Sequence, residues 1–365
     1  MSKVYFTDFR AVPEENILEK LHRLVKTAGI EKIDFNNKFT AIKIHFGEPG
    51  NVAYLRPNYV KVIADYIKQL GGIPYLTDCN TLYAGRRKNA VEHLTSAYEN
   101  GFNPFATGCH VLIGDGLKGH DEKIVPIDGK HIKEAKIGRA IMDANVFISL
   151  THFKGHENTG FGGTLKNIGM GSGSRGGKME MHYAGKPQVN PKKCVSCGTC
   201  YKVCAHGAIS FIDKKAFIDI NKCVGCGQCI GACNYDAISP IDGNSNRILN
   251  ERIAEYTYAV VKDRPHFHIS MIVDVSPFCD CHSENDVPIV PDIGMLASFD
   301  PVALDQACVD LVNAAPIMEN SLLGESEKLY DNHFANVSPD SDWESGLIHA
   351  ENIGLGSRKY DLIKI

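Results

Sequence analysis

The stretch CVSCGTCYKVCAHGAISFIDKKAFIDINKCVGCGQCIGAC, residues 194–233, determines how the remainder of this chain can be interpreted. Eight of the 13 cysteines lie within it. They form two runs with the same spacing, C-x2-C-x2-C-x3-C: Cys194, Cys197, Cys200 and Cys204, followed by Cys223, Cys226, Cys229 and Cys233. Three thiolates on one tight loop can bind three corners of a cubane iron–sulfur cluster, and the fourth corner needs a ligand from elsewhere. The stretch therefore predicts two such clusters.

The two halves of this stretch also match outside the cysteines, at a constant offset of 29 residues. The matching pairs include Gly198 with Gly227, Ala208 with Ala237, and Asp213 with Asp242. An internal duplication of one strand–loop–helix–strand unit explains this pattern. Over about residues 188–242 the sequence resembles the bacterial two-4Fe–4S ferredoxins.

In those ferredoxins the fourth cysteine of each run ligates the cluster of the other run. The resemblance therefore implies one ligand set of Cys194, Cys197, Cys200 and Cys233, and a second set of Cys223, Cys226, Cys229 and Cys204. The usual proline after the fourth cysteine is missing, and Ala205 and Asn234 stand in its place. Two alternatives stay open: a zinc site, because paired CxxC motifs also bind zinc, and a cluster pair with a purely structural role.

Length and composition bound the rest of the molecule. With 365 residues, 44% of them hydrophobic and 22% charged, we expect an ordinary soluble protein of about two domains. A net charge of −4 favours neither nucleic acid nor membrane as a partner, and no apolar run approaches the roughly 18–20 residues of a membrane span. The N-terminal residues lack the pattern of a secretory signal. We therefore expect a cytoplasmic protein, whose cysteines serve metal or redox chemistry rather than disulfides.

On both sides of the cysteines, predicted strands alternate with predicted helices. We expect strands at residues 3–9, 39–47, 73–78, 110–116, 144–150 and 267–275, and a last one from residue 360. We expect helices at residues 14–29, 57–72, 87–100 and 300–315, and a further helix that a capping box of Ser341 and Glu344 opens. This alternation predicts an α/β fold, with a mostly parallel sheet and helices on its faces.

Neither flank alone has the elements of a finished domain. We therefore expect one α/β domain made of residues 1–187 and 243–365, with an α+β ferredoxin-like module inserted at residues 188–242. Such an insertion is tolerated because the termini of a compact domain often lie close together.

The whole chain also resembles one family. The motifs THFKGHENTGFGGTLKNIGMG, residues 151–171, and CDCHSENDVPIVPDIGMLASFDPVALDQ, residues 279–306, are similar to those of proteins with the domain of unknown function 362. These are iron–sulfur centre proteins, and the similarity covers nearly the full length. The resemblance implies an iron–sulfur redox protein and gives no substrate.

A second functional site is expected in the α/β domain, where ligands bind at the carboxyl ends of the strands. His152, Lys154 and His156 come directly after the strand predicted at residues 144–150. They are candidate metal ligands or acid–base catalysts. The alternative is a pair of hydrogen-bonded structural histidines.

Cys279 and Cys281 follow the strand predicted at residues 267–275. Cysteines two apart on an extended chain point the same way. They could share a metal with His282, or form a redox-active thiol pair that receives electrons from the clusters. The alternative is two ordinary loop thiols.

A glycine-rich run extends from Gly160 to Lys178 and includes Lys166, Asn167 and Arg175. Backbone N–H groups together with Lys166, Arg175 and Lys178 could bind the phosphate of a flavin or nucleotide. The run is not a Walker A loop, because residues 172 and 179 are serine and methionine. The alternative is a flexible loop that leads into the ferredoxin-like module.

Other residues give weaker signals. Asp300 has the position of a helix N-cap, whereas Asp292 and Asp305 are candidates for a metal or catalytic role beside turn-forming alternatives. Cys79 follows another predicted strand and could join the site. The remaining two cysteines, Cys109 and Cys308, are expected to be buried apolar residues.

The leading hypothesis is an oxidoreductase of an oxygen-sensitive cytoplasm, in which two 4Fe–4S clusters pass low-potential electrons to an acceptor in the α/β domain. That acceptor could be a flavin, the thiol pair or a further metal ion. A second hypothesis is an electron carrier or adapter, whose α/β domain should lack a deep pocket lined by His152, His156, Lys166 and Cys279. A third is a metal-handling or sensor protein. Fold and motifs alone do not decide among them.

The charge of the cysteine-rich segment indicates a partner. Between residues 190 and 240 there are six lysines and three aspartates, namely Lys192, Lys193, Lys202, Lys214, Lys215, Lys222, Asp213, Asp219 and Asp236. A basic rim suits an acidic redox protein such as a ferredoxin or flavodoxin. Alternatively, the lysines only offset the negative charge of the clusters.

Overall fold

The structure, a computed structural model, describes residues 1–83, 85–183, 186–223, 228–233, 235, 237–240, 246–339 and 341–365. Several residues named above lie outside these ranges, among them one of the eight predicted cluster ligands: Cys226, Gly227, Asn234, Asp236 and Asp242.

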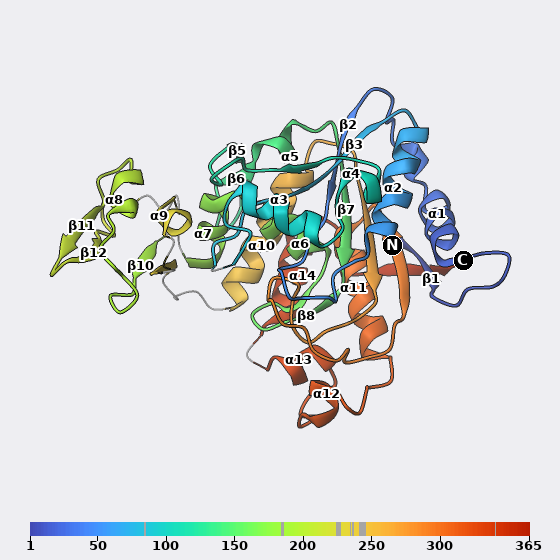
Figure 1. Cartoon of the computed structure of the whole chain (residues 1–365). Helices are drawn as coiled ribbons and strands as arrows, with labels where there is room; N and C mark the ends of the chain where they lie inside the picture. Colours follow the sequence, from blue (N-terminus) through green and yellow to red (C-terminus); the bar gives the residue numbers. More distant parts are fainter. Residues whose placement is uncertain are drawn as a thin grey trace.

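A mixed sheet of eight strands forms the centre of the molecule (Figure 1). Its order is β16-β1-β15-β14-β7-β2-β3-β4. The strands are β1 (Ser2–Asp8), β2 (Phe39–Lys43), β3 (Ile73–Asp78), β4 (Val111–Ile113), β7 (Val146–His152), β14 (His266–Ile272), β15 (Gly294–Ser298) and β16 (Tyr360–Lys364). Within this sheet all neighbouring strands pair in parallel except β15, which is antiparallel to β1 and β14. The predicted α/β fold with a mostly parallel sheet is confirmed.

Helices cover both faces of the sheet, and successive strand residues alternate between two hydrophobic cores. In β7, for example, Phe147 packs into one core while Val146 and Ile148 pack into the other. The second core is built with α1 (Ile17–Ala28), a 3-10 helix (Ile30–Lys32), α2 (Pro57–Gln69) and α3 (Ala90–Glu99), beside α4 (Pro104–Thr107). The first is built with α5 (Arg139–Asp143), α6 (Thr164–Ser172), α7 (Arg175–Tyr183), α10 (Asn246–Val261), α11 (Pro301–Asn313), α12 (Leu322–Glu325), α13 (His333–Val337) and α14 (Trp343–Asn352).

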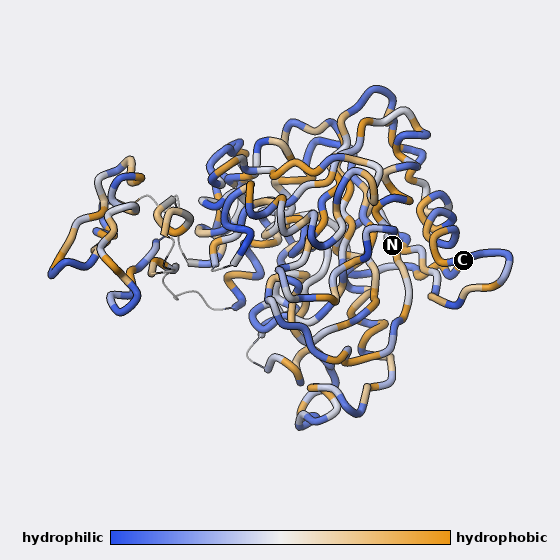
Figure 2. Tube along the Cα trace, viewed as in Figure 1, coloured by the Kyte–Doolittle hydropathy of each residue, from blue (hydrophilic) through white to orange (hydrophobic). Residues whose placement is uncertain are grey.

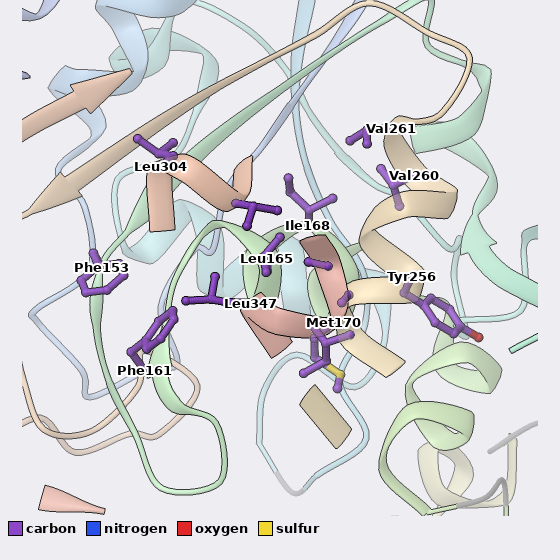
Figure 3. Packing of buried hydrophobic residues seen from close by; sticks show 14 of the residues in the cluster. Phe153, Phe161, Leu165, Ile168, Met170, Tyr256, Val260, Val261, Leu304 and Leu347 are labelled. Atoms are coloured by element: carbon purple, nitrogen blue, oxygen red, sulfur yellow. The ribbon is translucent and has the colours of Figure 1, made fainter. Parts of the chain in front are cut away.

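Two segments form elements that were not predicted from the sequence. The segment after β7 continues as a hairpin of β8 (Lys154–His156) and β9 (Gly160–Gly162). Beyond β9 the glycine-rich run forms the helices α6 and α7, so the alternative of a flexible loop is wrong. Its glycines permit close packing: a Cβ on Gly169 would lie 2.3 Å from the Ile253 carbonyl oxygen of α10. Figure 3 shows buried side chains of both helices, among them Leu165 and Ile168 of α6 and Tyr256 and Val260 of α10.

The helix termini test the capping predictions. Asp300 caps α11, since its carboxylate accepts hydrogen bonds from the Val302 and Ala303 N–H groups. The predicted capping box of α14 is wrong, because Asp342 precedes the helix and makes no side-chain cap. Ser341 instead donates its hydroxyl hydrogen to the Ser338 carbonyl oxygen.

A further hairpin pairs β5 (Glu122–Pro126) with β6 (Glu134–Gly138).

The cysteine-rich residues form a lobe that projects from the main body between α7 and α10 (Figure 1). Its elements are β10 (Pro187–Val189), α8 (Thr199–Val203), β11 (Ile209–Ile212), β12 (Lys215–Ile218), α9 (Gln228–Ala232) and β13 (Ile238–Pro240). β10 pairs with β13 and β11 with β12, both antiparallel. The lobe has a small core of its own that includes four of its cysteines. In Figure 2 the peripheral loops, including the tip of the lobe, are largely hydrophilic.

None of the helices among the described residues combines the length and the apolar composition needed to cross a bilayer.

Candidate functional site

A cavity of about 680 Å³ opens at the carboxyl ends of the central parallel strands. Three of its lining residues are the last residues of their strands: Lys43 of β2, Asp78 of β3 and His152 of β7. The loop that follows β14 contributes Cys279 and Cys281. This position is where parallel α/β sheets place their ligands.

Most of the second-site residues predicted from the sequence meet in this cavity. Its lining includes His152, Lys154, His156, Lys166, Asn167, Lys178, Cys279, Cys281 and His282. The hypothesis of an electron carrier or adapter predicted that no deep pocket would be lined by His152, His156, Lys166 and Cys279. All four residues line this cavity. Arg175 does not line it.

Asp280 anchors the loop that carries the two cysteines. Its buried carboxylate lies 2.8 Å from His152 Nδ1 and 3.0 Å from Lys154 Nζ. Burial alone would raise the pKa of Asp280, but the charges of His152 and Lys154 outweigh it and hold that pKa well below its usual range.

His152 has a second bond, since its Nε2 lies 2.7 Å from the Val273 carbonyl oxygen. Both ring nitrogens therefore face oxygen atoms, and neither points into open space where a metal ion could bind. His152 thus positions Asp280, and this geometry disfavours the expected ligand or acid–base role.

Cys279 and Cys281 lie on a turn, which the His282 N–H closes by donating to the Cys279 carbonyl oxygen at 2.9 Å. The expectation that their side chains point the same way holds, although a turn and not an extended chain is responsible. Their sulfur atoms and a ring nitrogen of His156 all lie within 4.8 Å of one another. Lys166 Nζ donates to Cys279 Sγ at 3.1 Å.

The two thiols of this pair have different electrostatic surroundings. A hydrogen bond from Cys279 and the charge of Lys166 lower the pKa of Cys281, whereas the hydrogen bond to Cys281 and burial raise the pKa of Cys279. Burial disfavours the Lys166 charge, but the two thiols outweigh it and raise the pKa of Lys166. The arrangement therefore favours a thiolate at Cys281 beside an ammonium group.

His156 decides whether this group is suited to a metal ion. Its Nδ1 accepts hydrogen bonds from the backbone N–H groups of Asn158, at 3.1 Å, and Thr159, at 3.2 Å. In the neutral ring the proton then sits on Nε2. Burial, followed by the charge of Lys166, lowers the pKa of His156 to about 4. A metal bound at Nε2 would move the proton to Nδ1, against two N–H donors.

The glycine-rich run contributes two residues that hold the cavity wall. Lys178 Nζ donates to the Gly173 carbonyl oxygen at 2.6 Å. Asn167 Oδ1 accepts from Lys43 Nζ at 2.9 Å, and its Nδ2 donates to Thr151 Oγ1 at 3.0 Å. Lys178 can turn toward a ligand, whereas the amide of Asn167 is already engaged on both sides.

Arg175 has a structural role in place of the predicted cofactor-binding one. Its buried guanidinium donates to the carbonyl oxygens of Lys118, at 2.9 Å, and Lys88. These bonds tie the first turn of α7 to the loop after β4 and to the loop before α3, in which Arg87, the residue before Lys88, lines the cavity. Sequence alone did not reveal this, because a cation in a glycine-rich run is equally typical of phosphate binding.

Sequence reasoning missed a buried network of charged residues on the cavity floor. Lys43 Nζ lies 3.0 Å from Asp78 Oδ1, and Arg87 Nε lies 2.7 Å from Glu48 Oε2. Arg87 Nη1 also lies 3.0 Å from His45 Nε2. Burial would raise the pKa of Asp78, but Lys43 together with the neighbouring His45, His93 and Lys178 outweighs it, and the pKa is lowered. The available signal was a charged residue at the end of each of two buried parallel strands.

The weaker candidates have structural explanations. Asp292 accepts a hydrogen bond from the Asp274 N–H at 2.8 Å, which joins the segment after β14 to the segment before β15. Asp305 accepts from the Thr164 and Leu165 N–H groups at 2.6 and 2.8 Å, so it holds the start of α6. Cys79 lines the cavity, with its thiol 3.4 Å from the Ser172 carbonyl oxygen. Cys109 and Cys308 are buried apolar residues, as predicted.

In the lobe, four of the predicted cluster ligands surround one small pocket: Cys194, Cys197, Cys200 and Cys233. Backbone N–H groups of Ala216 and Ala237 point at Cys194 Sγ and Cys233 Sγ at 3.4 and 3.3 Å. Such donors stabilise thiolates that ligate a cluster. In the second set, the Ala208 N–H points at Cys204 Sγ at 3.4 Å.

The lobe and the cavity share a wall. Lys178 and His182 of α7 line the cavity, while Met179 of the same helix packs into the core of the lobe. Leu82 belongs to both. The pKa of His182 is lowered to about 3 by burial and then by the charges of His156 and Lys166, which line the same cavity.

Three comparisons relate this chain to known proteins. Residues 40–310 match the model of a family described as domain of unknown function (DUF362). Among curated proteins there is no significant match.

Two solved structures are similar at low identity. A crystal structure of a protein from Thermotoga maritima has 14% identity and a TM-score of 0.40, over 83% of this chain and 59% of that one. The lactate racemase apoprotein from Thermoanaerobacterium thermosaccharolyticum has 9% identity and a TM-score of 0.40, over 100% of this chain and 83% of that one.

Proposed function

This chain belongs to the family described as domain of unknown function (DUF362), and we propose from its own site that it is an iron–sulfur oxidoreductase. Two 4Fe–4S clusters in the lobe pass low-potential electrons to a reducible group in the cavity of the α/β domain. The domain division expected from the sequence, with a ferredoxin-like module inserted at residues 188–242, is part of this proposal.

The thiols of the lobe support the cluster assignment. Cys194, Cys197, Cys200 and Cys233 surround one pocket, which is the crossed set that the ferredoxin resemblance implies. Their backbone N–H donors suit anionic sulfur ligands. Cys204, Cys223, Cys226 and Cys229 would hold the second cluster; of these, Cys226 lies outside the described residues. When bound, each cluster supplies one-electron transfer.

The shared wall between lobe and cavity is the observation that carries the proposal. An electron carrier without a substrate site of its own has no need of a cavity. In this protein a cavity lies on one side of α7, and the core of the lobe lies on the other side. Here α7 presents Lys178 and His182 to the cavity and Met179 to the lobe. Electrons that reach the lobe therefore need to cross little more than one helix to enter the cavity.

The cavity residues prepare the site for chemistry in several ways. The contacts of Asp280 with His152 and Lys154, here called the Asp280 clamp, fix the turn that bears the two thiols. Lys166 holds a proton at Nζ beside Cys279. The buried ion pairs of Lys43 and Arg87 keep the floor rigid and polar.

Anaerobic purification with quantitation of iron, sulfide, zinc and flavin tests the proposal. We expect iron and sulfide at the level of two cubanes. Cys197→Ser should lower the iron content, because Cys197 is an exposed predicted ligand, whereas Cys109→Ser is the matched control that removes a thiol outside the lobe. Stoichiometric zinc in place of iron would refute the cluster assignment.

The partner of the lobe is also a proposal: an acidic redox protein such as a ferredoxin or flavodoxin. The lobe exposes Tyr201, Phe211 and Phe217 among its basic residues, Lys192, Lys193, Lys202, Lys214 and Lys222. An apolar centre with a basic rim favours an acidic partner. Lys202→Glu should slow electron transfer from a reduced acidic ferredoxin several-fold at low salt, with Lys3→Glu as the control; equal rates would contradict this surface.

A metal-handling or sensor role is a second candidate, favoured by the close donor atoms of His156, Cys279 and Cys281. The backbone bonds to His156 Nδ1 count against it. Metal analysis distinguishes the two: a further metal ion that is lost on Cys279→Ser replacement would favour this second role.

A further inference from the structure

We propose that Cys279 and Cys281 are a redox-active dithiol–disulfide pair that reduces a small anionic disulfide bound in the cavity. This inference rests on the proposed function, because the reducing electrons come from a low-potential one-electron donor through the lobe. It assigns the acceptor inside the cavity and the class of substrate.

The geometry of the turn is the first argument. Asp280, between the two cysteines, is bonded to His152 and Lys154, so the turn cannot rotate freely. The two sulfur atoms are held on the cavity side, within 4.8 Å of each other. A disulfide needs side chains that face one another, and small movements of the two side chains then suffice to close the bond.

The two thiols differ in access, which gives them different roles. Cys279 is only 2% exposed and lies against Lys166. Cys281 is half-buried and lines the cavity, so a bound molecule can reach it. Cys281 is therefore the thiolate that attacks the substrate, and Cys279 is the thiol that resolves the mixed disulfide.

The chemistry balances in atoms and electrons. The oxidised pair takes up two electrons and two protons, which breaks its S–S bond and leaves two thiols. Cys281 Sγ then attacks a substrate disulfide RS–SR, forms a Cys281–SR bond and releases RS⁻. Cys279 Sγ displaces the second RS⁻ and restores the S–S bond. The two protons of the dithiol leave with the two RSH products, and Lys166 Nζ stands beside Cys279 to relay one of them.

The surroundings of the pair disfavour a metal ion at the same place. His156 Nδ1 already accepts two backbone N–H groups, so its other nitrogen carries a proton and donates. The Lys166 ammonium lies 3.1 Å from Cys279 Sγ and would repel a cation bound there. Lys166 Nζ and the protonated ring nitrogen of His156 are instead two hydrogen-bond donors beside the two sulfur atoms. Such donors stabilise a thiolate and can give a proton to the thiol that leaves.

The cavity indicates the class of disulfide. Its volume of about 680 Å³ lies in the range of small-molecule sites. The ammonium group of Lys166 donates to the Cys279 thiol, and that of Lys178 donates to the Gly173 carbonyl oxygen. Because neither is paired with a carboxylate in these contacts, both can turn to an incoming anion. A small disulfide with carboxylate groups fits this charge, whereas a cationic one does not.

The first experiment is an anaerobic reductive titration of the full protein that has been oxidised beforehand. Wild type should consume two more reducing equivalents than Cys279→Ser or Cys281→Ser. Cys79→Ser, which removes another thiol of the same cavity, should behave like wild type. Mass spectrometry after alkylation should find both cysteines of the pair unmodified in the oxidised wild type, because a disulfide does not react, and both alkylated after reduction.

The second experiment tests the substrate class on the same proteins. Reduced wild type should cleave dithiodipropionate, which is dianionic, at least tenfold faster than cystamine, which is dicationic. Lys166→Met should remove most of this preference. Equal rates for the two probes would overturn the anionic class.

Failure of this inference can be separated from failure of the proposed function. If the iron is present and reducible but wild type and Cys281→Ser consume equal equivalents, the dithiol pair is wrong while the oxidoreductase stands. A metal ion retained by the pair after chelation would likewise overturn it. If no reducible iron is found, the proposed function itself fails.

Discussion

Replacement of Asp280 by asparagine tests the clamp that positions the thiol pair. The carboxylate is fully buried and makes contacts of 2.8 and 3.0 Å with His152 Nδ1 and of 3.0 Å with Lys154 Nζ. Asparagine keeps the shape of the side chain but removes the charge and turns its NH2 group toward His152 or Lys154. Removing one partner of a buried pair costs about 3–5 kcal/mol, because the other charge remains buried.

We therefore expect Asp280→Asn to lower the free energy of unfolding by about 3–5 kcal/mol. The single tryptophan, Trp343, packs against Phe161 and reports unfolding of the α/β domain by fluorescence in anaerobic denaturant titrations. Asp34→Asn is the control, since Asp34 makes an exposed pair with Lys38 and should have no measurable effect.

The pH dependence of this loss has a defined sign. Because the pKa of Asp280 is lowered in the folded state, its contribution is present above the unfolded pKa of about 3.9 and disappears only in stronger acid. The deficit of Asp280→Asn should therefore be equal at pH 5 and pH 8. A loss below about 1 kcal/mol, or one that vanishes between these two pH values, would refute the clamp.

Further changes test the surroundings of the thiol pair and the helix beside it. Lys166→Met should slow alkylation of Cys281 near neutral pH, measured by mass spectrometry, because the ammonium that favours its thiolate is lost; an unchanged rate would argue against that role. Folding lowers the pKa of His156 from 6.5 to about 4. The free energy of unfolding of the wild type should therefore fall by up to about 3 kcal/mol as the pH is lowered from 6.5 to 4, and that of His156→Gln should fall by less. Gly169→Ala should lower the melting temperature, because its Cβ would lie 2.3 Å from a backbone oxygen, whereas Gly176→Ala, with its nearest contact at 3.4 Å, should be neutral or stabilising; equal effects would contradict the close packing of α6 and α10.

The sheet was predictable where each strand carries its own signal. The segments of β2, β3, β7 and β14 are apolar runs bounded by turn residues, and all four were predicted close to their observed bounds. β15 was missed because GMLAS is short, begins with glycine and shows no alternation, being buried on both faces. Its antiparallel direction follows from pairing with strands far away in the sequence.

The candidate site was predictable in its position but only in part in its residues. The rule that ligands bind at the carboxyl ends of parallel strands led to His156, Lys166 and Cys279. It was not applied to Lys43 and Asp78, although each ends a buried strand. The partners of His152 could not be predicted, because Asp280 meets it from 128 residues away.

The glycine-rich run shows a different limit of sequence reasoning. Glycines and serines lower helix propensity, and no helix was predicted in residues 160–178, which were interpreted as a phosphate-binding run or, alternatively, a flexible loop. Packing decides otherwise, since Gly169 and Gly177 allow α6 and α7 to approach backbone oxygens that larger residues would strike. Tertiary contacts thus override local propensity here.

The most direct test of the account is low-temperature electron paramagnetic resonance of the anaerobically reduced protein, with spin and iron quantitation on the same sample. Two neighbouring 4Fe–4S clusters predict about two spins for about eight irons per chain. A sample that contains zinc at the cysteines of the lobe, or iron that gives no signal after reduction, would contradict the claim that the lobe conducts electrons.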